Sequence, residues 1–152
     1  MEETIWEVMA LADRLPRSLR LGVLLRQAHR KAAGALDAAL EPLSLNVKHF
    51  GVLLHLSRLG ESTHTELVAL TGGDKAGMAR TIDGLIEAGL VARQVLPTDR
   101  RVSRLTLTAA GAAAAADARK RAITVGDELF GDFDGDDLDR LVDLLQRFVD
   151  PH

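Results

Sequence analysis

The chain has 152 residues, of which 47% are hydrophobic and 27% charged, and its formal net charge is −3. That size suits one domain with an extension, and the apolar content excludes an intrinsically disordered chain. The lack of cysteine excludes disulfide scaffolds, zinc–thiolate sites, cysteine nucleophiles and thiol redox sensors. No apolar run is long enough for a membrane helix, and the acidic first residues are unlike a signal peptide, so we expect a cytoplasmic protein.

Charge is distributed unevenly along the chain. Residues 14–31 contain six basic residues and no acid, and residues 91–108 contain four arginines and one aspartate. Residues 127–150 contain nine acids and two arginines. Two basic surfaces could therefore face a polyanion despite the negative total, although ordinary solvated helix faces would give the same pattern.

The N-terminal part of the chain predicts two helices. Residues 1–13, which include the only tryptophan, form a short amphipathic pattern that ends before Pro16. Residues 17–40 repeat leucine and alanine at three- and four-residue spacing, which predicts a long helix. Its stripe is rich in alanine and would allow another helix to approach closely.

A helix-turn-helix pattern follows. Residues 45–59 predict a helix, and Thr63 with Glu66 forms a capping box that opens a short one. After a glycine turn at residues 71–73, an apolar repeat predicts a further helix over residues 74–88. Its buried face is expected to hold Met78, Ile82, Leu85 and Ile86, and its opposite face Gly73, Ala76, Gly77, Arg80, Gly84 and Glu87, flanked by Lys75 and Asp83.

The segment after this helix predicts a β-hairpin. Residues 90–96 and 102–108 alternate apolar and polar side chains, which is typical of strands, and residues 97–101 form a polar loop between them. A hairpin directly behind a helix-turn-helix is a wing. The tip of this wing would carry two adjacent arginines, Arg100 and Arg101.

The C-terminal part predicts two more helices. Residues 109–126 are dominated by alanine and predict a stiff helix that continues to about residue 130. An acidic, flexible segment at residues 131–137 caps a last helix, whose apolar stripe includes Leu138, Leu141, Leu145 and Phe148. The stripes near both ends are too large for a small core to cover, so we expect them to bury each other across a twofold axis.

These elements predict a mainly α fold with a small β-hairpin wing. We expect a winged helix-turn-helix at residues 45–108 that binds DNA. N-terminal dimerisation helices in residues 1–44 and C-terminal connecting and dimerisation helices in residues 109–152 would flank it.

Other kinds of site are poorly supported. The acidic segment from Asp132 imitates a calcium loop, but its sixth position is Asp137 where such a loop needs glycine. No two histidines have the spacing of zinc ligands, and no nucleophile or acid–base constellation occurs. We therefore predict no cofactor, no metal and no enzymatic activity, while a metal site assembled from different helices stays open.

The order of motifs resembles the MarR family of bacterial transcriptional regulators over residues 17–149. The segments that carry the resemblance are IEAGLVAR at residues 86–93, PTDRR at residues 97–101 and LTLTAAG at residues 105–111. The resemblance implies a homodimer that binds double-stranded DNA, with a recognition helix in the major groove and the wing in the minor groove. It also implies a ligand-responsive repressor that acts on a pseudo-palindromic operator.

The resemblance places the DNA contacts on two elements. On the recognition helix they are Lys75, Ala76, Gly77, Ala79 and Arg80. On the wing they are Arg100 or Arg101, with Asp99 as the partner that orients the guanidinium. A narrow A·T-rich minor groove concentrates negative potential and favours an inserted arginine. Neutralisation of phosphates by these cations, and by Arg93, would make affinity fall with salt.

The recognition helix departs from the family pattern, because small residues replace the usual serine or threonine. These residues are Ala76, Gly77 and Ala79. They either let the helix approach thymine methyl groups closely or leave specificity to the wing and to DNA shape.

Two further expectations concern partners. In the family, a small effector often binds between the dimerisation helices and the winged helix. By resemblance, that cleft would take a small aromatic or amphipathic effector and be lined by Leu25, His29, Phe50 and Leu54, although the same residues could be plain core. The alternative function is a protein-interaction or architectural module whose basic wing faces an acidic partner.

Overall fold

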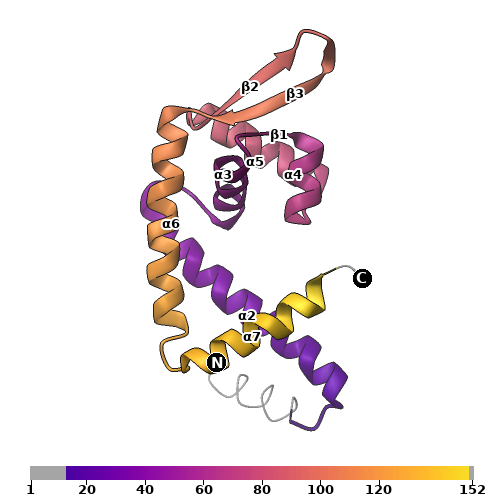
Figure 1. Cartoon of the computed structure of the whole chain (residues 1–152), viewed down its shortest axis with the longest axis vertical. Coiled ribbons are helices and arrows are strands. Elements are labelled where there is room, and N and C mark those ends of the chain that lie inside the picture. Colours follow the sequence, from indigo (N-terminus) through magenta and orange to yellow (C-terminus); the bar gives the residue numbers. More distant parts are fainter. Residues whose placement is uncertain (1–12, 151–152) are drawn as a thin grey trace, which may run out of the picture. The chain divides into compact units, whose positions relative to one another are not determined.

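The computed structural model describes residues 13–150, so the helix predicted for residues 1–13 lies almost wholly outside the described part. The chain divides into two compact units, Met1–Ala35 and Leu36–His152. Figure 1 shows a mainly helical chain with one small sheet, which confirms the predicted winged helix-turn-helix with flanking helices. The elements in order are α2 (Arg17–Leu40), a 3-10 turn (Glu41–Leu43), α3 (Val47–Leu59), β1 (Glu61–Thr63), α4 (His64–Thr71), α5 (Lys75–Glu87), β2 (Val91–Leu96), β3 (Asp99–Leu107), α6 (Ala109–Leu129) and α7 (Gly135–Val149).

The helix-turn-helix begins and ends where its capping residues predict. The capping box at α4 is confirmed, because Thr63 Oγ1 accepts from the Glu66 amide at 3.2 Å and Glu66 Oε2 accepts from the Thr63 amide at 3.0 Å. Gly72 ends α4 at φ +68°, a left-handed conformation that favours glycine. Asp74 caps α5, and the two helices meet as the sequence predicts.

The sheet has one strand more than the predicted hairpin. Its order is β1-β3-β2, with both pairs antiparallel, and Ser62 of β1 lies opposite Leu105 of β3. A three-residue strand is too short for an alternating pattern to be visible in sequence, which is why β1 was not expected. This strand ties the start of α4 to the base of the wing.

The predicted loop of the wing is too long. The turn consists of Pro97 and Thr98 alone, and residues 99–101 already belong to β3. Val95 pairs with Ser103, whereas Leu96 pairs with Asp99, so three residues of β3 are accommodated at a bulge with none opposite them on β2. Bulges of this kind bend a strand and redirect its side chains.

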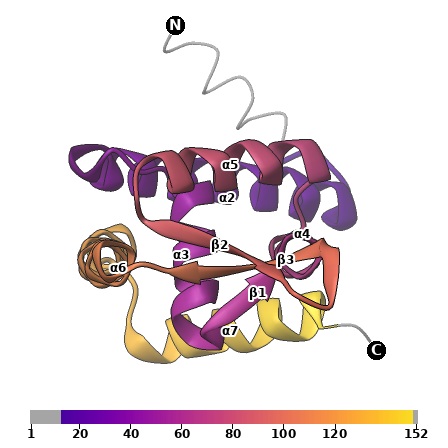
Figure 2. The same ribbon diagram turned by 90° about the horizontal axis from the view of Figure 1, so that it is seen from above.

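The buried core lies within the second unit, with α3 at its centre. α3 packs against α4, α5, α6, β1 and β3, and Figure 2 shows β2 and β3 crossing over it. Of the face predicted to be buried on α5, Met78, Ile82 and Leu85 are buried and Ile86 is half-buried. Thr81 is buried too, and its hydroxyl donates to the Gly77 carbonyl at 3.0 Å, so its polar group is satisfied.

The segment before α7 is shorter than predicted. Asp134 caps the helix by accepting from the Asp137 amide at 2.8 Å, so residues 135–137 form the first helical turn instead of a flexible connection. The negative charges of the acids in this turn interact favourably with the positive end of the helix dipole. None of the residues of α7 is buried in the single chain.

Candidate nucleic-acid interface

The exposed face of α5 carries the side chains predicted to contact DNA. Lys75, Ala76 and Arg80 are exposed, whereas Gly77 and Ala79 are half-buried. α5 also packs against β2, so the recognition helix and the wing belong to one body. The face therefore offers two cations among small residues, with little bulk between the helix backbone and an approaching surface.

Asp74 organises the N-terminus of this helix. Its carboxylate accepts from the Gly77 amide at 2.6 Å, and this hydrogen bond holds the pKa of Asp74 below its usual value. The positive charges of Arg80 and Lys48 lower the pKa further. Lys48, on α3, is thus a cation beside the recognition helix that the sequence did not connect with it, because the two residues are far apart in the chain.

A histidine joins the two helices of the helix-turn-helix. The ring Nε2 of His64, the first residue of α4, lies 3.2 Å from the carbonyl oxygen of Lys75, the first residue of α5. This contact connects the two helix starts across the glycine turn. The sequence predicts no role for His64, since its spacing to the other histidines matches no metal-site motif.

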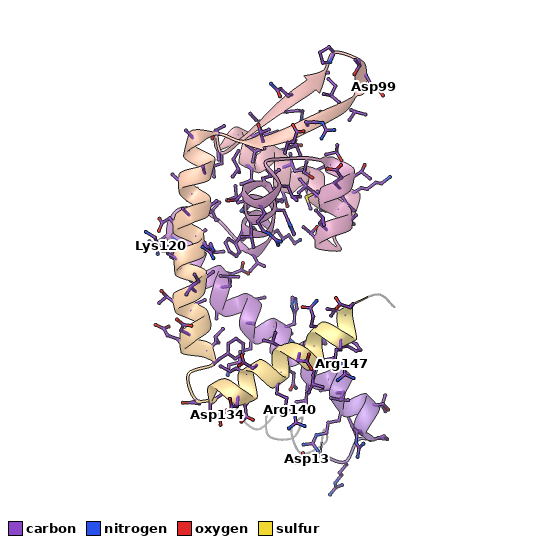
Figure 3. All side chains as sticks on the ribbon, viewed as in Figure 1. Asp13, Asp99, Lys120, Asp134, Arg140 and Arg147 are labelled. Carbon is purple, nitrogen blue, oxygen red and sulfur yellow. The ribbon has the colours of Figure 1, made fainter. Side chains whose placement is uncertain are left out.

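The wing places its predicted residues around the bulge. Asp99 lies at the far end of the hairpin (Figure 3), opposite Leu96 in the register. Arg100 and Arg101 follow it directly on β3. The three consecutive residues thus open β3 at the tip of the wing, while their roles toward DNA stay a prediction.

Two other arginines of the basic segment already form ion pairs. Arg93 Nη2 lies 3.3 Å from Asp83 Oδ1, which connects β2 with the exposed face of α5. Arg104 Nη1 lies 3.2 Å from Glu61 Oε1, which connects β3 with β1. Both pairs are partly exposed, so each is worth at most about 1 kcal/mol, and a phosphate could displace the carboxylate from either.

The residues predicted to line an effector cleft belong to different compact units of the chain. Leu25 and His29 belong to the first compact unit, whereas Phe50 and Leu54 belong to the second, where Phe50 packs against the core. A cleft of about 330 Å³ lies elsewhere, between α3, α4 and the start of α5, and includes Lys48, His55, Asp74 and Gly77 in its lining. The predicted effector cleft therefore stays a prediction.

Two kinds of feature are absent from the part of the chain that the structure describes. No group of three or more histidines and acids in residues 13–150 is placed to hold a metal ion. None of the described helices is both long and apolar enough to cross a membrane.

Comparisons with known proteins agree with this architecture. A MarR family profile matches residues 43–102, from before α3 to within the wing. A MarR-family transcriptional regulator from a Rhodococcus species is 27% identical with a TM-score of 0.82, over 90% of this chain and 97% of that one. A mutant of Escherichia coli MarR complexed with operator DNA is also 27% identical with a TM-score of 0.79, over 86% and 94% of the two chains.

A third structure concerns regulation by a small molecule. BpsR from Bordetella bronchiseptica, whose DNA binding is regulated by 6-hydroxynicotinic acid, is 27% identical with a TM-score of 0.81, over 86% of this chain and 99% of that one. Fold, wing, motif order and these matches agree: residues 43–102 match the MarR family, and the chain is similar over most of its length to winged-helix transcriptional regulators of that family.

Proposed function

We propose that this protein is a homodimeric repressor that binds a pseudo-palindromic DNA operator and releases it when a small effector binds. The observation that carries the proposal is the exposed face of α5, with Lys75 and Arg80, directly beside a wing that ends in Arg100 and Arg101. A helix and a hairpin of one body whose sequences both carry cationic residues suit the two grooves of a duplex. We expect no catalytic activity.

The apolar stripe of α7 supports the homodimer. Leu141, Val142, Leu145 and Phe148 are between 38% and 72% exposed, and they repeat along one helix. A monomer rarely leaves such a continuous apolar surface in water, whereas two copies related by a twofold axis can cover it reciprocally. A twofold dimer carries two recognition helices, and this symmetry is what a pseudo-palindromic operator matches.

A similar protein and the composition of this chain indicate the class of effector. A relative, BpsR, is regulated by 6-hydroxynicotinic acid, and the present chain has no cysteine with which to sense oxidants. We therefore expect a small aromatic or amphipathic molecule that binds without a covalent bond. The cleft predicted around Leu25, His29, Phe50 and Leu54 is its first candidate site.

The test is fluorescence anisotropy on a labelled duplex from upstream of the coding sequence, with a scrambled duplex and a salt series alongside. We expect saturable binding that prefers the upstream duplex by roughly a thousandfold or more. Reversal of both wing charges, Arg100→Glu with Arg101→Glu, should weaken binding at least about a hundredfold and reduce the salt dependence.

The chain offers a matched control on α6, where Arg119 and Lys120 are also adjacent, exposed and basic. Arg119→Glu with Lys120→Glu changes the net charge equally but leaves the wing intact, so DNA affinity should stay within about threefold of the wild type. Equal losses in both double variants would show that only total charge matters. No duplex binding at low salt, even after refolding without bound ligand, would favour the protein-interaction module instead.

A further inference from the structure

One hydroxyl joins the base of α6 to the end of α5. Thr108 Oγ1 donates to the Gly89 carbonyl at 2.6 Å and accepts from the Gly111 amide at 3.0 Å. The Thr108 amide also donates to the Leu90 carbonyl at 3.1 Å. A hydroxyl has one proton to donate and lone pairs to accept, so this side chain serves both helices at once.

The acceptor side of this junction is fixed to the recognition helix. Gly89 lies directly after α5 with φ +75°, and its amide donates to the Ile86 carbonyl at 2.9 Å. The Leu90 amide donates to the Leu85 carbonyl, also at 2.9 Å. The turn of residues 89–90 is therefore an extension of the last turn of α5, and whatever holds this turn holds that end of the helix.

On the α6 side of the junction, the two backbone segments are in close contact. Gly111 is buried, and a Cβ atom at this position would overlap the carbonyl oxygen of Leu90 and crowd Leu107. The backbone of the first turn of α6 thus lies directly against the turn that follows α5. Only glycine permits this approach, which explains the glycine three residues after Thr108.

We propose that Thr108 is a positioning residue for DNA binding, because its hydroxyl holds the C-terminal end of α5 in a set direction relative to α6. The inference rests on the proposed function, in which α5 reads DNA and α6 leads toward the dimerisation helices. Through this link, a change in the direction of α6 alters the direction of the recognition helix and of the wing, since α5 ends and the wing begins at residues 89–90.

The alternative role for Thr108 is a plain helix cap, and chemistry separates the two roles. A cap needs only an acceptor for the Gly111 amide, which serine, threonine and aspartate all supply. The link needs a donor for the Gly89 carbonyl, which an ionised aspartate lacks. Thr108→Asp therefore keeps the cap and removes the link, whereas Thr108→Ser keeps both.

The experiment uses the full-length protein, whose lack of native cysteine allows site-directed spin labelling without background. Cysteines at the exposed positions Ala76→Cys on α5 and Ala116→Cys on α6 carry the labels. Dilution with unlabelled protein restricts the distances measured by pulsed electron resonance to one chain of each dimer. DNA affinity and melting temperature are measured on unlabelled variants, with Ala109→Asp as the control that adds the same charge next to an intact Thr108.

We expect the wild type, Thr108→Ser and Ala109→Asp to share one narrow distance distribution and one DNA affinity. Thr108→Asp should broaden the distance distribution. It should also bind DNA about tenfold more weakly, which corresponds to the free energy of one such hydrogen bond. Its melting temperature should stay within a few degrees of the wild type, because the cap is kept. An unchanged distance distribution in Thr108→Asp would overturn the link. If no variant bound DNA, the proposed function would fail, and the distances alone would still decide whether Thr108 sets the direction of α5.

Discussion

Two helices of similar length, α3 and α7, both carry an apolar stripe, but the stripes differ in how far they are buried. α3 has 13 residues and buries Val52, Leu53 and Leu56 completely or nearly so. α7 has 15 residues and a clearer apolar stripe, yet it buries none, and Phe148 is 72% exposed. An apolar stripe therefore predicts that a helix face is buried, but it does not indicate whether the same chain or a second copy buries it.

The largest expected effect is a loss of stability when a buried side chain of α3 is truncated. Leu53→Ala removes a fully buried side chain from the centre of the core, and the neighbours can collapse only in part. We expect the free energy of unfolding to fall by about 2–5 kcal/mol. Chemical denaturation measures this loss, which should be the same at every protein concentration once dimer dissociation is accounted for.

A second, smaller effect is expected on dimerisation when the exposed stripe of α7 is truncated. Phe148→Ala should leave the fold of the single chain unchanged, because that side chain is largely exposed there, and weaken the dimer by about 2 kcal/mol, as for an aromatic interface anchor. Sedimentation equilibrium measures the dissociation constant. Arg140→Ala on the same helix, a charged side chain (Figure 3), is the control and should change it little. An equal shift in both variants would contradict a dimer built on the apolar stripe.

The recognition helix provides a smaller test with two matched glycines. Gly84→Ala should raise the free energy of unfolding by about 1 kcal/mol, because alanine is the better helix former and the new Cβ meets only His49 Nε2 at 3.8 Å. Gly77→Ala should gain less, since its Cβ would lie 3.2 Å from the carboxylate oxygens of Asp74. Thermal unfolding compares the two variants.

The same two variants decide between the readings of this helix. If glycine lets the backbone lie close to DNA, each alanine should reduce operator affinity although it stabilises the fold. Unchanged affinity in both would assign specificity to the wing and to DNA shape. Anisotropy titrations at one fixed salt concentration measure this.

The smallest expected effect is on pH dependence. Burial lowers the pKa of His49 from its usual 6.5, so the unfolded chain binds a proton more readily than the folded one. The contribution of neutral His49 to the free energy of unfolding is therefore complete above pH 6.5. It declines as the pH falls through 6.5 toward the lowered pKa of the folded state. Protonation also removes the acceptor for the Asn46 amide, now 3.2 Å from His49 Nδ1.

Urea unfolding between pH 8 and pH 5 measures this decline. His49→Gln should flatten it, because glutamine does not titrate and its amide oxygen can still accept at this capping position. The acids whose pKa values are lowered, Glu66 and Asp74, titrate below pH 4.5 and do not interfere. A decline of the same size in His49→Gln would assign the effect to another histidine.

Local chemistry alone predicted most element boundaries. Thr63 caps α4 with its side-chain oxygen as predicted, and Gly72, in the predicted glycine turn, follows α4 with positive φ. These signals depend on neighbours within three or four residues, so they are readable in sequence. The cationic residues of the recognition helix followed from the same periodicity, which separates its buried and exposed faces.

Contacts between distant residues needed the tertiary structure. β1 exists because Glu61–Thr63 pairs with β3 more than forty residues later, and the bulge at Arg100 and Arg101 depends on the register between two strands. The approach of Lys48 to Asp74 and the ion pair of Arg93 with Asp83 depend on how helices and strands pack.

The helices, the wing and the resemblance to the MarR family were therefore readable from the sequence, because capping, periodicity and motif order are local properties of a chain. Only the tertiary structure showed which cations are already paired, how the strands pair at the wing tip and that one hydroxyl at Thr108 connects α5 with α6. The physical reason is that hydrogen bonds and ion pairs act over a few ångströms in space, whereas separation along the chain gives no measure of that distance.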